Sequence, residues 1–454
     1  MRHKEQSTNT AYFQQDVVID TLTENKISAD SAAKDEQITK QQDIHKGEPG
    51  FLHKLMRKKK LEGFFLFVTS QCNSKCSTCF YHEQLNSNQD MTFEEIRTMS
   101  ETSPDFDKLW LSGGEPFMRD ELVDIIKVFY NNNKARVINL PTNGLLTKRI
   151  DQGIARLLEE CPELTIHLNF SIDGLGVTHD KIRGVPGNFR KTIATMELIK
   201  KKYGDNPKLL QNVATVVTPE ALPEMFDLGT YLLKKDLIAT QFFEVVRGDP
   251  KDPSTKDLSK EQIQELRKTV FPLIEEQANR LFKDFSGTKK KLAKTFFLGF
   301  IKFVNQLQDD NYFGPKHWGM SCTAGKTTIV LDHNGDFRSC EMRPPIGNMK
   351  DYDYNITNAL YSEAMKNEIE EIGGGKKANC WCTHGCWITV GNRIAAPVAM
   401  GYNAPAGGEA SRGASRAGTC VRVPTQASML PSDTRNPDSV PQENSLAPGI
   451  PWGR

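Results

Sequence analysis

Short apolar segments alternate with amphipathic segments between residues 64 and 246, and this alternation constrains the fold of the chain most strongly. The amphipathic segments carry apolar residues at i, i+3, i+4 and i+7, which is typical of helices packed on a core. Six such units predict an α/β fold, most naturally a partial (βα)6 barrel with its active face at the carboxyl ends of parallel strands. The predicted strands are FFLFVTS (64–70), LWLSG (109–113), RVINLPTNG (136–144), LTIHLNFSIDG (164–174), LLQNVATVVT (209–218) and TQFFEVV (240–246).

The regions that flank this core, which we place at 60–250, differ from it in composition. Residues 1–50 are polar and contain few apolar side chains, which predicts a disordered arm. Residues 251–312 hold two longer helical stretches, and we expect this helical insert to cover the barrel mouth. Residues 313–390 have little periodicity and many Cys, Gly and Pro residues, which predicts a small cysteine-rich domain that binds metal.

The segment 391–454 has a composition of its own. It contains 8 of the 23 prolines, whereas the last lysine of the chain is Lys377 and the last phenylalanine is Phe337. Such a segment lacks the side chains of a packed core. Two interpretations stay open: a natural low-complexity tail, or a frameshifted or non-native sequence that begins near residue 390.

The overall charge and the cysteine content restrict the class of protein. With 58 basic and 57 acidic side chains the net charge is +1, which argues against a nucleic-acid partner. No apolar run approaches the roughly 18 to 20 residues of a membrane span. The first fifteen residues contain no apolar region typical of a secretory signal, so we expect a cytoplasmic protein. In that reducing compartment ten cysteines favour metal or redox chemistry over disulfides.

Three cysteines stand together directly after the first predicted strand. Cys72, Cys76 and Cys79 form a C-x3-C-x2-C motif. Three thiolates can hold three irons of a [4Fe–4S] cluster and leave the fourth iron open for another ligand. A zinc site or three buried cysteines are the alternatives, but zinc loops usually pair C-x2-C with a second ligand pair elsewhere. The position at the expected active face favours catalysis.

Further motifs follow the next predicted strands in order: SGGEP (112–116), PTNG (141–144), SIDG (171–174), HDKIRG (179–184) and GNF (187–189). Together with the cysteine triplet they resemble the radical S-adenosylmethionine (SAM) superfamily over about residues 62–250. The resemblance implies that SAM chelates the open iron of the [4Fe–4S] cluster. It also implies that an electron from a donor such as flavodoxin or ferredoxin cleaves SAM to a 5′-deoxyadenosyl radical, which abstracts hydrogen from the substrate.

The resemblance also implies a set of cofactor-binding residues. Two glycines let the backbone approach the ligand, a carboxylate accepts from the methionine ammonium, polar side chains bind the carboxylate and ribose, and an arginine clamps the carboxylate. Asp173 and Gly174 fit either this site or an ordinary turn. Thr78 stands where many relatives have an aromatic residue, so the group that covers the adenine is left open. The implied residues are Gly113, Gly114, Glu115, Thr142, Asn143, Ser171 and Arg183.

A second cysteine set is spread over the predicted metal domain. With Gly335 and GNM (347–349) it resembles the SPASM domain, or its shorter twitch form, of radical enzymes that modify peptides. We expect one auxiliary [4Fe–4S] cluster, for which four of five cysteines suffice and either Cys380 or Cys382 is spare. Zinc is the alternative, and His384 is expected to be a ligand or to bond a ligand sulfur. The set is Cys322, Cys340, Cys380, Cys382 and Cys386.

These motifs predict a radical SAM enzyme that acts on a peptide or a small molecule. The alternative is a non-catalytic iron–sulfur or zinc scaffold that retains the barrel. Such a scaffold would have no use for Glu115, Thr142 and Ser171 at the barrel mouth, which favours the enzyme. Cys161 is expected to be only buried, and Cys420 in the tail to have no role.

Overall fold

The structure is a computed structural model that describes residues 61–314, 322–373, 380 and 382–385. The chain divides into two units, Met1–Tyr402 and Asn403–Arg454, and only the first contains described residues. The predicted arm 1–50, the predicted tail 391–454, Cys386 and Cys420 therefore lie outside the described residues.

One nine-stranded sheet organises the described part of the chain. Its strand order is β6-β5-β4-β3-β2-β1-β7-β8-β9. Neighbouring strands from β6 to β7 are parallel, whereas β8 and β9 are antiparallel additions, and the sheet does not close on itself. This confirms the predicted partial barrel. The strands are β1 Gly63–Phe67, β2 Lys108–Ser112, β3 Val137–Thr142, β4 Thr165–Ser171, β5 Leu209–Val217, β6 Gln241–Val245, β7 Thr328–Leu331, β8 Asp336–Arg338 and β9 Gly347–Asn348.

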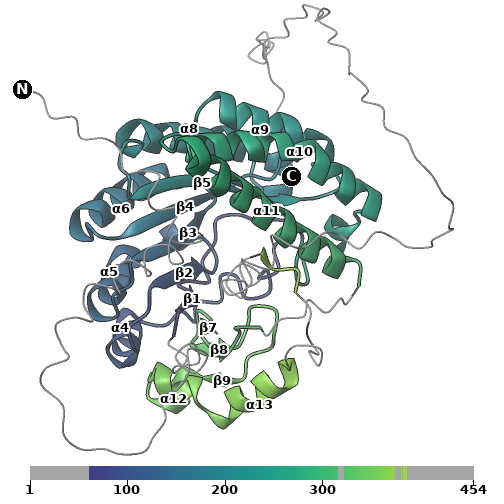
Figure 1. Ribbon diagram of the computed structural model, residues 1–454. Helices are drawn as coiled ribbons and strands as arrows, with labels where there is room; N and C mark the ends of the chain where they lie inside the picture. The colour runs from purple at the N-terminus through teal and green to yellow at the C-terminus, as the bar shows by residue number, and fades with distance from the viewer. Residues whose placement is uncertain (1–60, 315–321, 374–379, 381, 386–454) are drawn as a thin grey trace, which may run out of the picture. The chain divides into compact units, whose positions relative to one another are not determined.

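Helices follow the parallel strands along the chain, and α4, α5, α6, α8 and α9 cover the outer face of the sheet (Figure 1). The short helix α7 was not expected, although it contains most of the HDKIRG motif. The helices are α4 Phe93–Thr102, α5 Leu122–Asn132, α6 Thr147–Glu160, α7 Gly176–Arg183, α8 Asn188–Tyr203, α9 Met225–Lys234, α10 Lys260–Leu281, α11 Gly287–Tyr312, α12 Ile356–Leu360 and α13 Glu363–Ile372. Among the described helices none is both long and apolar enough to cross a membrane.

The main core lies between the sheet and these helices. Alternate strand residues such as Ile138 and Leu140 point outward and are fully buried. Phe64 of β1 is fully buried and packs edge-on against Phe106 and Phe129, with ring centroids 4.8 and 5.0 Å apart. Aromatic pairs of this geometry add to the hydrophobic stabilisation of the core.

The cysteine-rich segment continues the barrel sheet. Strand β7 pairs with β1 in parallel, with Gly63 opposite Thr328 and Leu66 opposite Leu331. Strand β1 therefore has a paired strand at each edge, and all five of its residues are buried. The segment 313–390, predicted as a small metal domain, thus adds strands β7–β9 to the barrel sheet.

Replacing Phe64 by Ala tests the importance of the aromatic core. Loss of a fully buried aromatic side chain leaves a cavity, so the free energy of unfolding in urea should fall by about 3–5 kcal/mol. Val177, which is 82% exposed, provides the control, and Val177→Ala should change stability by less than about 0.5 kcal/mol. Equal effects of the two changes would contradict this description of the core.

Candidate active site

The three cysteines of the triplet lie on the loop that follows β1. The backbone N–H of Cys72 donates to Asn86 Oδ1 (3.0 Å), and the Ser74 N–H donates to Cys72 Sγ (3.4 Å). Burial raises the pKa of the Cys72 thiol to about 12 and also raises that of Cys79. Because metals bind the thiolate, a bound metal would have to supply the energy for deprotonation.

Helix α7 holds this loop by its last backbone carbonyls. The N–H groups of Lys75 and Ser77 donate to the carbonyls of Arg183 (3.0 Å) and Ile182 (2.9 Å). Gly184, directly after the helix, has a φ of +65°, and a Cβ atom there would lie 2.9 Å from the Lys75 carbonyl oxygen. The C-terminal end of α7 and the cysteine loop therefore fit together only because residue 184 is glycine.

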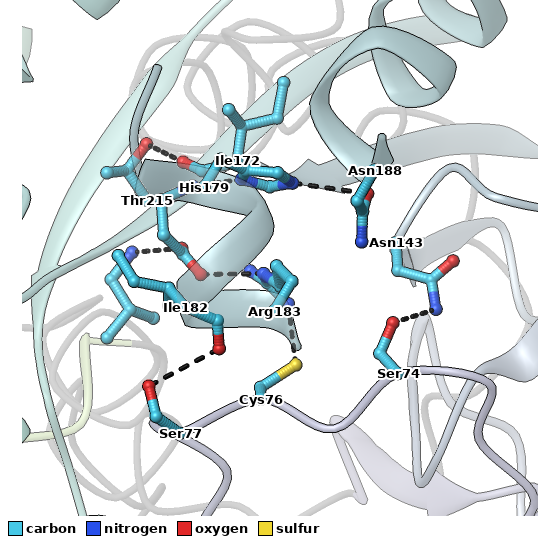
Figure 2. A network of polar contacts seen from close by, with 12 residues as sticks. Ser74, Cys76, Ser77, Asn143, Ile172, His179, Ile182, Arg183, Asn188 and Thr215 are labelled. Atoms are coloured by element: carbon cyan, nitrogen blue, oxygen red, sulfur yellow. Dashed lines mark hydrogen bonds and ion pairs between the residues drawn. The ribbon is translucent and has the colours of Figure 1, made fainter. Parts of the chain in front are cut away.

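Arg183 connects the cysteine loop to the end of β4. Its Nε lies 2.7 Å from Asp173 Oδ2, and both side chains are largely buried. Its Nη1 lies 3.7 Å from Cys76 Sγ (Figure 2). Asp173 Oδ1 in turn accepts from the Val216 N–H (2.9 Å). Asp173 thus fixes the guanidinium beside a cysteine sulfur, which is more than an ordinary turn residue would do.

His179 completes a buried network behind this pair. Its Nδ1 accepts from the Asp173 N–H (3.1 Å), so the hydrogen is on Nε2, which donates to Asn188 Oδ1 (3.2 Å; Figure 2). Burial lowers the pKa of His179 to about 4, so the ring is neutral at pH 7. The roles of His179 and Asn188 were not predicted, although both residues belong to motifs that the sequence showed.

Glu115 joins the ends of β2 and β3. Its carboxylate is 2% exposed and accepts from the Thr142 hydroxyl (2.9 Å), the Asn143 N–H (2.7 Å) and the Phe117 N–H (3.3 Å). Burial raises the pKa of Glu115 to about 7. Groups of the chain itself therefore occupy most of the acceptor positions of the Glu115 carboxylate, which is predicted to bind the methionine ammonium. One acceptor position on Oε2 is left.

Gly113 and Gly114 approach the cysteine loop. Gly113 has a φ of +117°, and a Cβ atom there would lie 2.3 Å from the Thr69 carbonyl oxygen. A Cβ atom on Gly114 would lie 2.1 Å from the Gln71 carbonyl oxygen. These glycines therefore let the end of β2 approach the cysteine loop closely, and their approach to a ligand stays a prediction.

The two remaining cofactor candidates lie at neighbouring strand ends. The Asn143 side-chain amide donates to Asn73 Oδ1 (2.7 Å) and Ser74 Oγ (3.0 Å), so it too holds the cysteine loop. Ser171 ends β4 and is partly exposed on the inner side of the sheet. Ser171 is thus partly accessible to a ligand, whereas Glu115, Thr142 and Asn143 are buried.

The described cysteines of the second set gather on the inner side of β1 and β2. They pack against an aromatic cluster that contains Phe65, Phe67 and Trp110, and Cys79 packs against the same cluster. In three of these cysteines the sulfur accepts a hydrogen bond from the backbone N–H of the residue two positions later in the chain, at 3.3–3.5 Å. Burial, followed by neighbouring thiolates, raises the pKa of both Cys340 and Cys382. The four are Cys322, Cys340, Cys380 and Cys382.

Helix α11 holds the segment that carries Cys382. The side-chain amide of Gln308 donates to the Thr383 carbonyl (2.8 Å), and that of Asn311 donates to the Cys382 carbonyl (3.0 Å). His384 is buried and its imidazole pairs with Glu341, while its backbone N–H contacts the Cys382 sulfur (3.3 Å). The imidazole Nε2 therefore bonds a carboxylate, and a bond from His384 to a ligand sulfur stays a prediction. Cys161 is simply buried, at the end of α6.

Comparison with known proteins identifies the family. The radical SAM superfamily matches residues 66–228. A probable GTP 3′,8-cyclase of Methanococcus maripaludis is 33% identical over 298 residues, which cover 63% of this chain and 86% of the cyclase. The chain belongs to the radical SAM superfamily. The AdoMet-dependent heme synthase of Methanosarcina barkeri is 29% identical over 193 residues, 41% of this chain, and here the match spans only about half, 52%, of the relative.

The fold is shared with a solved structure, anSMEcpe with bound AdoMet and Kp18Cys peptide, which has a TM-score of 0.51 and 18% identity over 75% of this chain and 98% of that chain. The predicted family is confirmed, and the SPASM- or twitch-like extension stays a prediction. This radical SAM enzyme accordingly has a [4Fe–4S] cluster and S-adenosylmethionine as cofactors, and the thiolate-rich loop beside a buried arginine suits them chemically.

The titration of His179 provides a test of the buried network in this radical SAM enzyme. Its pKa falls from about 6.5 in the unfolded chain to about 4 in the folded protein, so the unfolded chain takes up the proton first as the pH falls. The contribution to stability is complete above pH 6.5 and is lost towards pH 4, a change of about 3 kcal/mol. Urea unfolding between pH 7 and pH 4.5 should show this loss in the wild type, and a smaller loss in His179→Gln. Identical pH dependence of the two proteins would contradict the assignment.

Proposed function

We propose that this chain reductively cleaves S-adenosylmethionine at a [4Fe–4S] cluster held by Cys72, Cys76 and Cys79, and that the resulting 5′-deoxyadenosyl radical abstracts hydrogen from a substrate. The observation that carries the proposal is the placement of three cysteines on one loop, fixed at the carboxyl ends of parallel strands beside Arg183. Three thiolates leave one iron free for the cofactor. When bound, the cluster supplies the electron that breaks the S–C5′ bond.

The other site residues have separate roles in binding and orienting the cofactor. Arg183, oriented by Asp173, provides a buried positive charge beside the cysteine loop, suited to the methionine carboxylate or to the cluster sulfurs. Ser171 is the accessible hydroxyl for the ribose or carboxylate. Glu115, Thr142 and Asn143 orient the strand ends, and the remaining acceptor position of Glu115 serves the methionine ammonium. We propose that Gly113 and Gly114 serve the cofactor indirectly, by shaping the loop.

We propose that the four described cysteines of the second set hold an auxiliary [4Fe–4S] cluster. Cys380 and Cys382 both lie in the cysteine cluster with Cys322 and Cys340, so four thiolates are present and neither of the two needs to be spare. The backbone N–H groups directed at three of the sulfurs support this proposal, because such bonds stabilise the ligands and tune the potential. Cys386, the fifth predicted ligand, lies outside the described residues.

The substrate is proposed to be a peptide or a small molecule, and the electron donor a flavodoxin or ferredoxin. The Kp18Cys peptide bound by anSMEcpe, whose fold this chain shares, is consistent with a peptide. A cytoplasmic setting, with a reducing environment for the clusters, fits the use of cysteine in this chain. The competing proposal, a non-catalytic scaffold, is disfavoured by the buried Arg183–Asp173 pair, because a purely structural site has little use for a charge beside a cysteine sulfur.

Replacing all three triplet cysteines by Ala tests the proposed catalytic cluster. The variant, reconstituted anaerobically with iron and sulfide and reduced with dithionite in the presence of SAM, should form no 5′-deoxyadenosine by chromatography. Cys161→Ala is the matched control, because Cys161 is buried in the main core. Formation of 5′-deoxyadenosine by the triple variant would refute the assignment of the cluster ligands. If the protein is a non-catalytic scaffold, neither the variant nor the wild type forms 5′-deoxyadenosine.

The iron content tests the auxiliary cluster separately. Two four-iron clusters give about eight irons per chain, and replacing Cys322 and Cys340 together by Ala should remove about half of them. Cleavage of SAM should persist because the triplet is intact. About four irons together with one zinc in the wild type would exclude the auxiliary cluster and leave the catalytic proposal standing.

A further inference from the structure

The inner face of the sheet is covered on one side and accessible on the other. On β1 and β2 the inward residues Phe65, Phe67 and Trp110 are buried beneath the cysteine-rich segment. On β3, β4 and β6 the outward residues are buried, whereas the inward ones are partly exposed. At the end of β5 buried and partly exposed residues alternate in the same way. Strands β3–β6 therefore present an accessible inner face beside the auxiliary cysteines.

This accessible face is polar and carries little charge. The strands β3–β6 contain no Lys or Arg and one acidic residue, Glu244. Asn169 is held in place because its Oδ1 accepts from Asn212 Nδ2 (3.2 Å) and its own Nδ2 donates to the His167 carbonyl (3.2 Å). Such amide groups are suited to uncharged hydrogen-bonding partners. The partly exposed inward polar residues are Asn139, His167, Asn169, Ser171 and Glu244, and the inward Asn212 is buried.

Two arginines at the ends of these strands are engaged by the protein, as is Arg267 of α10, which bonds the Phe243 carbonyl of β6 and pairs with Asp309. Arg183 pairs with Asp173 (2.7 Å) at the cysteine loop. Arg247 lies 5.0 Å from the centre of the Phe80 ring and 3.8 Å from Glu341 Oε1. Neither arginine adds a positive charge to the middle of the face. The balance of charge on β3–β6 is therefore negative, and its source is Glu244.

Glu244 stands on the inner side of β6, beside the segment that carries Cys382. It is partly exposed, and its Oε2 accepts from Gln308 of α11, which also binds the Thr383 carbonyl. A Cβ atom on Gly385 would lie 2.9 Å from Glu244 Oε1, so the carboxylate packs closely against the main chain of residue 385 and its exposed part faces away from that residue. The hydrogen bond from Gln308 orients the carboxylate without neutralising its charge.

We propose that the inner face of β3–β6 binds the part of the substrate that contains amide-like hydrogen-bonding groups and a positive charge, and that Glu244 receives that charge. This inference rests on the proposed function. A polyanion would meet a carboxylate and no arginine or lysine on these strands, and phosphate or multiple carboxylates require such cations. The inference therefore separates this chain from relatives that act on anionic molecules, such as the probable GTP 3′,8-cyclases and the Fe-coproporphyrin III synthase of Methanosarcina barkeri.

The experiment compares defined probes on the reconstituted full chain in the presence of SAM and dithionite. The probes are GTP, coproporphyrin III, and two mixtures of acetylated, amidated hexapeptides with degenerate neutral positions, one with a central Lys and the other with a central Glu. The readout is the formation of 5′-deoxyadenosine above the rate without probe. A charge-assisted hydrogen bond predicts that half-maximal stimulation needs about tenfold less of the Lys mixture than of the Glu mixture. GTP and coproporphyrin III should not stimulate.

The variants assign the preference to Glu244. In Glu244→Gln, which retains an oxygen for Gln308, the preference for the Lys mixture should disappear, and Glu244→Lys should reverse it. Glu220→Gln is the matched control, because Glu220 lies on the surface and pairs with Lys181 (2.7 Å), and it should keep the preference of the wild type.

Three results would overturn the inference: stimulation by GTP or coproporphyrin III, equal responses to the two peptide mixtures, or no response to the Lys mixture. Retention of the preference in Glu244→Gln would also overturn the role of Glu244. These results differ from the result expected if the proposed cleavage of S-adenosylmethionine is wrong. In that case the wild type forms no 5′-deoxyadenosine, either with a probe or without one.

Discussion

The contact between the cysteine loop and the end of α7 is the interaction on which the rest of the site depends. Two backbone N–H groups of the loop bind the last carbonyls of α7, and the Arg183 side chain extends from the same turn to Cys76. Since Asp173 and His179 fix Arg183 from behind, the loop, the helix and the end of β4 form one unit. The motifs SIDG, HDKIRG and GNF, which are separate in the sequence, thus serve a single structural purpose.

The second constraint is the pairing of β1 with β7. It places the cysteine-rich segment against Phe65, Phe67 and Trp110, and so fills the inner side of β1 and β2. One half of the inner face is used to pack the second cysteine set, and the other half is accessible and polar. The fold therefore brings the two cysteine sets and a polar surface together without a separate domain interface.

Much of this arrangement was predictable, because the relevant signals are local. All six barrel strands were predicted from apolar runs, and the observed β4 ends at Ser171 because Asp173 and Gly174 form the turn into α7. The pairing of Gly63 with Thr328 was not predictable, since the run Thr328–Leu331 is short and its partner is distant in the sequence.

The roles of several site residues also could not be predicted from the sequence. Glu115 was expected to bind the cofactor, but whether a carboxylate meets a ligand or backbone N–H groups depends on the packing of neighbouring strand ends. The support of Cys382 by Gln308 and Asn311 arises from two amides on one helix face, a pattern with no distinctive signal in a polar helix. His384 likewise pairs with Glu341, which is distant in the sequence.

The central claim is that the triplet leaves one iron open and that S-adenosylmethionine occupies it. Electron–nuclear double resonance of the reduced protein, with S-adenosylmethionine carrying 15N in the amino group and 17O in the carboxylate, measures this directly. Direct binding predicts hyperfine coupling of both nuclei to the cluster, with loss of the signal when Cys72, Cys76 and Cys79 are replaced. A reduced cluster that shows no coupling to either nucleus at saturating S-adenosylmethionine would contradict the claim.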